Sequence, residues 1–392
     1  MNGARERALG FEFATASRIL FGAGKVAEVP GEVKALGLSR VLFVTGRSGA
    51  RAEPLARALA DRGIDAVPLR VAAEPTIEVV REAVERARAD GCQGVVAVGG
   101  GSALDCGKAV AGLLGNGAAD PLEHLEVVGR GRPLERPALP LVAVPTTAGT
   151  GSEVTRNAVV GAEGTKASLR SPLLLARLAV VDPDLLTGAP REVLVGSGLD
   201  ALSQLVEPYL SLRANPLTDG FAAEGIRRSA RSLRPAVLEE LTAPRREDLA
   251  LASLFGGLCL ANAGLGAVHA FAGPAGAALG APHGALCAAL LAPSLTVNLR
   301  ALRTRAPTAP AVARFGDLAH WLTGSPEASA EDGIAFLARL CRDLGVVGLG
   351  ALGLASGGVG DLIERARAAS SMKPNPIVLT DAELHEIVER AI

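Results

Sequence analysis

The sequence predicts a two-domain fold, with an α/β domain over residues 1–184 and an all-helical domain over residues 185–392. The chain has 392 residues, which is longer than a domain with a single hydrophobic core usually is. This length fits two domains of roughly 150 to 200 residues each. Short β-branched runs alternate with Ala-, Arg- and Glu-rich stretches as far as about Asp182. Apolar residues make up 49% of the chain but aromatic ones only 3%, which favours a core of Ala, Val and Leu, as in helices packed on a parallel sheet.

The strand candidates of the first domain are, in order, RVLFVT, DAVPLRV, GVVAVGG, LVAVPTT and LAVVDP. Helical stretches separate them, and strands that alternate with helices indicate βαβ units. Beyond Leu185 the strand signal fades, and long Ala/Leu/Arg segments with helical periodicity follow, interrupted by Gly and Pro clusters. We therefore expect the second domain to be helical.

Charge and cysteine content exclude several classes of protein. The net charge is −1, with acids and bases interspersed, which argues against nucleic acid or a membrane surface as partner. The five cysteines are scattered and never spaced as CxxC, which argues against a disulfide framework and a thiolate zinc site. The N-terminal MNGARERALGFEF lacks a secretory apolar stretch, and no run of about 18 uncharged apolar residues occurs. We expect a soluble, cytoplasmic protein.

A glycine-rich turn follows the third strand candidate, at GVVAVGGGSALDCGK. Gly99, Gly100, Gly101 and Ser102 stand where the apolar run ends and a helical stretch begins. Backbone without Cβ atoms can approach a pyrophosphate, and the start of a helix offers unpaired N–H groups. Such a turn also occurs simply as a tight strand–helix connection, and Asp105, three residues on, favours nucleotide binding only slightly.

A second loop of small residues follows the fourth strand candidate, at VAVPTTAGTGSE. Thr146, Thr147 and Thr150 lie among glycines there, and hydroxyls with bare backbone suit phosphate and ribose. Ser152 and Glu153 also fit the plain start of a helix. Two such loops in one parallel sheet favour a nucleotide and a Rossmann-like dinucleotide-binding domain.

The first strand candidate ends in Gly46, Arg47 and Ser48. An acid at the end of such a strand often accepts from the adenosine 2′-hydroxyl. Here no carboxylate repels a 2′-phosphate, and one guanidinium is available to bind it, although an exposed Arg is often merely solvated. The segment therefore favours NADP over NAD.

His269 and His283 fall in GLGAVHAFAGPAGAALGAPHGALCAALL, an apolar stretch with no other polar side chain to satisfy an imidazole. A buried histidine needs a partner. In one continuous helix residues fourteen apart are separated by about 21 Å, so the two share a metal only if the chain reverses between them. The chain offers Gly273, Pro274, Gly280 and Pro282 for this reversal.

Asp200 lies upstream in an amphipathic helix, with Gln204 one turn later on the same face. A carboxylate in an apolar segment is costly unless it is paired or bound to a metal. Together with His269 and His283 it makes a three-ligand site, and three N/O ligands with an open fourth position are typical of catalytic zinc. Alternatively, Asp200 is a helix N-cap and each histidine a hydrogen-bonded core residue.

These motifs occur in one order: GGGSxxDxxK, PTTAGTGSE, DAL, HxFAGP, PHG and SSMKPNP. In this the whole chain resembles the iron-containing (group III) alcohol dehydrogenase family, with its dehydroquinate synthase-like fold. The resemblance implies an NAD(P)-dependent alcohol dehydrogenase or aldehyde reductase, with a metal that polarises the substrate oxygen. It further implies that residues 99–102, Asp105 and residues 146–150 hold the dinucleotide, that Lys166 approaches the nicotinamide ribose, and that Val180 and Leu185 line the nicotinamide side.

Two positions depart from the family pattern. Gln204 stands where iron-dependent members usually carry a histidine ligand, and an amide oxygen binds transition metals poorly. Gln204 is then a weak fourth contact or supports the ligands, which favours zinc over iron. Gly273 stands where many members have a histidine near the nicotinamide, so proton exchange runs through water or ribose hydroxyls.

The expected substrate is a small neutral alcohol or aldehyde, and the expected assembly is a homodimer or larger homo-oligomer, as in the relatives. Two alternatives remain from the sequence. One is a maleylacetate reductase-type oxo-acid reductase, although residues 261–293 contain no Lys or Arg to meet a dicarboxylate. The other is a non-catalytic nucleotide-binding relative that has lost its metal.

Overall fold

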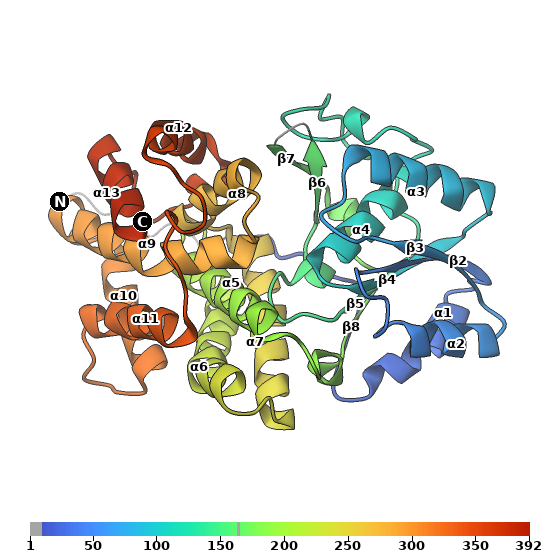
Figure 1. Ribbon diagram of the computed structural model, residues 1–392, viewed down its shortest axis with the longest axis horizontal. Helices are drawn as coiled ribbons and strands as arrows, with labels where there is room; N and C mark the ends of the chain where they lie inside the picture. Colours follow the sequence, from blue (N-terminus) through green and yellow to red (C-terminus); the bar gives the residue numbers. More distant parts are fainter. Residues whose placement is uncertain (1–9, 163–164) are drawn as a thin grey trace.

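A computed structural model describes residues 10–162 and 165–392. Residues 1–9 of the N-terminal segment considered above lie outside this description. The chain forms an α/β part and a helical part side by side (Figure 1). The predicted boundary at residue 184 falls in the short 3-10 helix Pro183–Leu186, between the last strand and the first long helix of the helical part.

The α/β part is built on a six-stranded parallel sheet of order β1-β8-β5-β4-β2-β3. Its central strands β4 and β5 are buried along their whole length, which explains why they appear in the sequence as continuous Val/Ala runs. The sheet strands are β1 (Ile19–Phe21), β2 (Arg40–Thr45), β3 (Asp65–Arg70), β4 (Gly94–Gly99), β5 (Leu141–Pro145) and β8 (Leu178–Val181). The five predicted strands and the fold class are confirmed, and β1 was missed.

Helices cover both faces of this sheet (Figure 1). Alternate residues of β4 point to opposite sides, so Val96 and Val98 pack with α1 and α2 while Val95 and Ala97 pack with α3 and α4. The four helices are α1 (Val29–Ala35), α2 (Glu53–Asp61), α3 (Ile77–Ala89) and α4 (Gly101–Gly115). All parallel strands therefore end at one edge, where the loops after β2, β4 and β5 lie next to one another.

A two-stranded antiparallel hairpin, β6 (Asn157–Ala162) and β7 (Thr165–Arg170), stands outside the main sheet. The sequence analysis did not predict it. Residues on β6 alternate between buried and half-buried, because one face packs against α4. The hairpin brings Lys166 of β7 to α8, a helix of the other part.

The helical part contains nine helices longer than one turn in the region that the structure describes. They are α5 (Arg191–Leu210), α6 (Pro216–Leu238), α7 (Ala243–Ala263), α8 (Ala267–Leu279), α9 (His283–Arg305), α10 (Pro310–Thr323), α11 (Ala330–Leu344), α12 (Val359–Ala368) and α13 (Asp381–Ala391). Helix α5 packs against α6, α7 and α9, and is the element on which the site is built.

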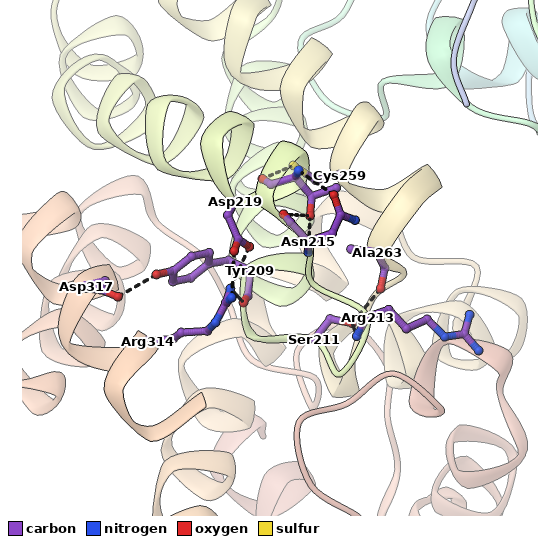
Figure 2. A network of polar contacts seen from close by, with 10 residues as sticks. Tyr209, Ser211, Arg213, Asn215, Asp219, Cys259, Ala263, Arg314 and Asp317 are labelled. Carbon is purple, nitrogen blue, oxygen red and sulfur yellow. Dashed lines mark hydrogen bonds and ion pairs between the residues drawn. The ribbon is translucent and has the colours of Figure 1, made fainter. Parts of the chain in front are cut away.

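A polar network fixes the C-terminal end of α5 (Figure 2). Tyr209 Oη donates to Asp317 at 2.7 Å, and Arg314 donates to the Tyr209 carbonyl and to both carboxylate oxygens of Asp219. Burial and the Asp317 carboxylate raise the pKa of Tyr209. Ser211 Oγ donates to the carbonyl of the last residue of α7 at 2.6 Å. These contacts tie the C-terminal end of α5 to α6, α7 and α10.

Helix α9 is long and apolar enough by length and composition to cross a membrane. However, 72% of its most apolar window is buried inside the protein. Leu286, Leu290 and Leu291 of this helix are fully buried in the hydrophobic core. We therefore interpret α9 as the central core helix of the helical part.

Candidate functional site

One face of α5 carries three buried side chains with a carboxylate or amide group. Asp200, Gln204 and Glu207 follow one another at helical spacing and are only 2%, 3% and 5% exposed. Asp200 lies in the middle of the helix, so the alternative that it caps the helix N-terminus is wrong. Burying two carboxylates on one face is costly without partners, and the partners come from α8 and α9.

His269 lies in the first turn of α8 and contacts both carboxylates. Its Nε2 atom lies 3.2 Å from Asp200 Oδ1, and its Nδ1 atom lies 2.6 Å from Glu207 Oε2. The other Glu207 oxygen accepts from the Val268 backbone N–H at 2.6 Å. Glu207 thus accepts from the Nδ1 side of the ring, which leaves Nε2 as the nitrogen directed at Asp200.

His283 reaches the same carboxylate because the chain reverses, as the sequence predicted. Helix α8 ends at Leu279, Gly280 adopts a φ of 63°, and Pro282 precedes α9, whose first residue is His283. His283 Nε2 lies 3.7 Å from Asp200 Oδ1, and the two imidazole centroids are 5.5 Å apart. Residues 273 and 274 lie inside α8 and take no part in the reversal, contrary to expectation.

Cys287 joins this cluster one helical turn after His283. Its Sγ lies 3.5 Å from His283 Nε2, and the side chain is fully buried. Asp200, His269, His283 and Cys287 each offer one donor atom, and all four atoms lie within 4.8 Å of one another. The expectation that this stretch has no other side chain able to satisfy an imidazole is wrong, because His283 and Cys287, four residues apart, lie on the same face of α9.

Close backbone packing fixes α5 and α9, two of the three helices that carry these side chains. A Cβ added at Gly284 would lie 2.2 Å from the Gly196 carbonyl oxygen, so α9 meets α5 through bare backbone beside the cluster. Near Gln204, a Cβ at Gly256 of α7 would lie 3.3 Å from Gln204 Cβ. The Gln204 Oε1 atom is buried and has no hydrogen-bond partner among the described residues.

The charges in the cluster stabilise one another. Burial opposes ionisation of Asp200, but the charges of His283 and His269 outweigh it and hold the pKa of this carboxyl below its usual value. Burial also opposes charging of His269, yet Cys287 and the two carboxylates raise its pKa well above the usual value. Cys287 raises the pKa of His283, and Asp200 adds to this against the effect of burial. A divalent cation that displaces the shared protons suits such a cluster.

The donor set fits a divalent transition metal. Imidazole and carboxylate suit iron and zinc, and a thiol adds a softer donor. Gln204, predicted as a weak fourth contact, supplies the one buried oxygen on this face of α5 that is left without a hydrogen bond among the described residues. The residues present therefore agree chemically with a metal site.

The two predicted phosphate loops lie against each other at the carboxyl edge of the sheet. Thr146 N donates to the Gly99 carbonyl at 2.9 Å. A Cβ at Gly100 would lie 3.4 Å from Thr147, and one at Gly101 only 2.9 Å from Thr150. Helix α4 begins at Gly101 without a capping side chain, with Ser102 in its first turn. This leaves backbone N–H groups at the helix start available to an anion.

Asp105 and Lys108 fasten the second loop to α4. Asp105 accepts from Ser152 Oγ and, at 3.1 Å, from the Val159 N–H, and its carboxylate lies 3.0 Å from Lys108 Nζ. Lys108 is 1% exposed and also donates to Thr155 Oγ1 at 3.0 Å. Both carboxylate oxygens of Asp105 thus have protein partners.

The remaining predicted cofactor residues lie in three places. Gly46 packs against Gly99, so Arg47 and Ser48 stand beside the first loop, where Arg47 Nε donates to the Ala72 carbonyl at 3.0 Å. Across the sheet, Val180 is fully buried and Leu185 partly buried in the core beneath α1 and α2. Lys166 Nζ pairs with Glu74 at 2.8 Å and would lie 3.5 Å from a Cβ at Gly276.

Comparison with known proteins places these features in a family. The family model described as "Iron-containing alcohol dehydrogenase" matches residues 16–183, and that described as "Fe-containing alcohol dehydrogenase family, C-terminal" matches residues 194–392. Long-chain-alcohol dehydrogenase 1 of Geobacillus thermodenitrificans is 33% identical, with 94% of each chain covered. The 1,3-propanediol dehydrogenase of Citrobacter freundii is 33% identical over 97% of this chain and 98% of its own.

Solved structures agree. The crystal structure of a 1,3-propanediol oxidoreductase superposes with a TM-score of 0.90 at 31% identity, covering 98% of this chain and all of the other. An alcohol dehydrogenase from Oenococcus oeni gives a TM-score of 0.89 at 30% identity with the same coverage. Fold and site thus define a dinucleotide-linked oxidoreductase with a divalent metal. More particularly, the chain belongs to the iron-containing alcohol dehydrogenase family, whose members interconvert alcohols and carbonyl compounds.

Proposed function

We propose that this dehydrogenase reduces small neutral aldehydes with NADPH, and catalyses the reverse oxidation, at a zinc site formed around Asp200, His269 and His283. The observation that carries the proposal is the convergence of their donor atoms within 4.8 Å, with Asp200 and His269 buried and His283 half-buried. Buried carboxylate and imidazole groups are costly to keep if they no longer bind a metal, which speaks against a non-catalytic nucleotide-binding relative.

A bound metal would act as a Lewis acid on the substrate oxygen. The chain's own residues prepare for this role. Glu207 holds the Nδ1 side of His269 at 2.6 Å, and Asp200 contributes a carboxylate that its histidine neighbours keep ionised. Bare backbone in the two glycine-rich loops suits the pyrophosphate of the cofactor. We propose that Asp105 acts by positioning the second loop, since both of its oxygens already have protein partners.

The proposed preference for NADPH depends on residues 46–48. No carboxylate stands in this segment, and Arg70 donates to the Arg47 carbonyl, so two guanidinium groups lie near the end of β2. We expect Arg47→Ala to weaken NADPH binding and leave NADH binding almost unchanged. Fluorescence titration of both cofactors against wild type and Arg47→Ala tests this. Equal losses for the two cofactors would contradict the assignment. NADH is the natural comparison, because one relative is named an NAD-dependent methanol dehydrogenase.

Charge near α8 favours a neutral substrate over an oxo acid. Residues 261–293 hold no Lys or Arg, and the cation that reaches α8 from the hairpin, Lys166, is already paired with Glu74. Gly273 adds space, because a Cβ there would meet no atom within 4 Å. We propose that this space admits water for proton exchange. Comparing short neutral aldehydes with maleylacetate as substrates separates the two enzyme classes.

Single replacements of His269 and His283 by Ala test the metal role. We expect NADPH-linked aldehyde reduction and bound zinc to be lost together, while cofactor binding and the circular dichroism spectrum are retained. Full activity of the variants in metal-free buffer would contradict the proposal. We also propose a cytoplasmic homodimer or larger homo-oligomer; its mass in solution is measured by light scattering.

A further inference from the structure

Cys287 differs in its surroundings from the other cysteines that lie against these helices. Cys341 Sγ lies 3.6 Å from the Ala288 carbonyl, and Cys259 Sγ lies 3.3 Å from the Thr218 carbonyl. Both face backbone oxygen in the core. Cys287 Sγ instead faces the Nε2 atom of His283 and stands within 4.8 Å of the donor atoms of Asp200 and His269.

The spacing of these atoms matches ligands that share one metal. Around tetrahedral zinc, with bonds of about 2.0 Å to nitrogen or oxygen and 2.3 Å to sulfur, ligand atoms lie roughly 3.3 Å (N to O) and 3.6 Å (N to S) apart. Here Asp200 Oδ1 lies 3.2 Å and 3.7 Å from the two histidine Nε2 atoms, and Cys287 Sγ lies 3.5 Å from His283 Nε2. A lone thiol–imidazole hydrogen bond explains only the last of these distances.

Gln204 leaves a place for a different donor. It stands one turn after Asp200 on α5, and its amide oxygen is a poor ligand for transition metals. Cys287 stands one turn after His283 on α9, so α9 can present two donors from one face. Of Gln204 and Cys287, the thiol of Cys287 is the better donor for a transition metal.

We propose that the Cys287 thiolate is the fourth protein ligand of the metal, so that the centre combines one carboxylate, two imidazoles and one thiolate. The substrate oxygen then binds as a fifth ligand, since catalytic zinc can expand to five-coordination. The inference rests on the proposed metal-dependent dehydrogenase function and deepens it. A thiolate favours zinc and other thiophilic ions over magnesium or manganese. The metal preference of this chain is therefore set by Cys287 as well as by the loss of a histidine at position 204.

The test is cobalt substitution in the full-length protein. Co²⁺ is added to the metal-depleted wild-type enzyme, and the absorption spectrum is recorded. A thiolate ligand gives an intense sulfur-to-cobalt charge-transfer band in the near ultraviolet, which nitrogen and oxygen ligands alone do not produce. We expect this band in wild type and in the control Cys341→Ser, and its loss in Cys287→Ser. Zinc affinity, measured by chelator competition, should fall at least about tenfold in Cys287→Ser.

The outcomes separate this inference from the proposed function. If wild type binds one Co²⁺ without the band, Cys287 is not a ligand, although the metal-dependent function stands. The same holds if the band survives in Cys287→Ser. If wild type binds neither Co²⁺ nor Zn²⁺, both the inference and the metal role fail. The wild-type spectrum needs no variant to fold, so the inference is testable even if Cys287→Ser is unstable.

Discussion

Nδ1 of His269 lies 2.6 Å from Glu207 Oε2, and the second oxygen of Glu207 accepts from the Val268 backbone N–H. One carboxylate therefore fixes the ring and the start of α8 together. Such a partner sets the tautomer of a metal-binding histidine and increases its basicity. We therefore propose that Glu207 is a positioning residue for the proposed metal site.

Glu207→Gln should weaken metal binding without removing a ligand. The amide cannot accept equally well from both Nδ1 and the Val268 N–H, so His269 loses its orientation. We expect zinc affinity to fall by about 10- to 100-fold, measured by chelator competition. Glu224→Gln, which breaks an ion pair with Arg228 on α6, is the matched control and should leave affinity unchanged. Equal affinities for the two variants would remove this role from Glu207.

Gln204→His should increase the affinity for Fe²⁺. The new imidazole lies one turn from Asp200 on the same face of α5. A Cβ at residue 256 would lie 3.3 Å from Gln204 Cβ, so the glycine at that position leaves room for the larger ring. Nitrogen is a better donor than amide oxygen for this ion, so a gain of at least about tenfold is expected. Gln204→Leu keeps the volume without a donor and serves as control. Titration under anaerobic conditions measures both, and a gain in the leucine variant would refute the ligand explanation.

Gly101→Ala should weaken cofactor binding while preserving the fold. The added Cβ would lie 2.9 Å from Thr150 Cγ2 and push the two loops apart, although alanine itself favours the helix. We expect the dissociation constant for NADPH to increase about tenfold, which corresponds to about 1.4 kcal/mol. Gly316→Ala, on α10 with no atom within 4 Å of its Cβ, is the control. Unchanged NADPH binding in Gly101→Ala would argue against a pyrophosphate site there.

Glu153 should make stability depend on pH. It lies beside the second loop, burial raises its pKa to about 7, and its Oε2 has no hydrogen-bond partner among the described residues. The folded protein therefore holds a proton that the unfolded chain releases near the ordinary value of 4.5. Stability should fall as pH rises from about 4.5 to 7 and then level off, by up to about 3 kcal/mol.

Glu153→Gln isolates this contribution. The variant keeps the size of the side chain but cannot ionise, so its free energy of unfolding should fall less over the same pH range. Urea denaturation at several pH values measures the difference between the two proteins. Parallel curves for wild type and Glu153→Gln would show that Glu153 does not titrate in this range.

The central strands of the main sheet were predictable because burial on both faces requires continuous apolar runs, as in β4 and β5. The three-residue β1 and the hairpin β6–β7 give weaker patterns, since one strand is very short and the others are buried on one face only. Asp200, His269 and His283 were conspicuous as polar residues in apolar segments. Glu207 and Cys287 were not, because their role depends on how α8 and α9 meet α5, which local spacing does not reveal.

The contact between Gly196 and Gly284 separates the packing of α5 and α9 from the choice of side chains in the cluster. Because backbone meets backbone there, the distance between α5 and α9 does not depend on which side chains point into the cluster. The side chains at positions 204 and 287 can therefore be replaced one at a time without changing the distance between the two helices. A change of metal at this centre therefore requires new side chains, but no change in how α5 and α9 pack.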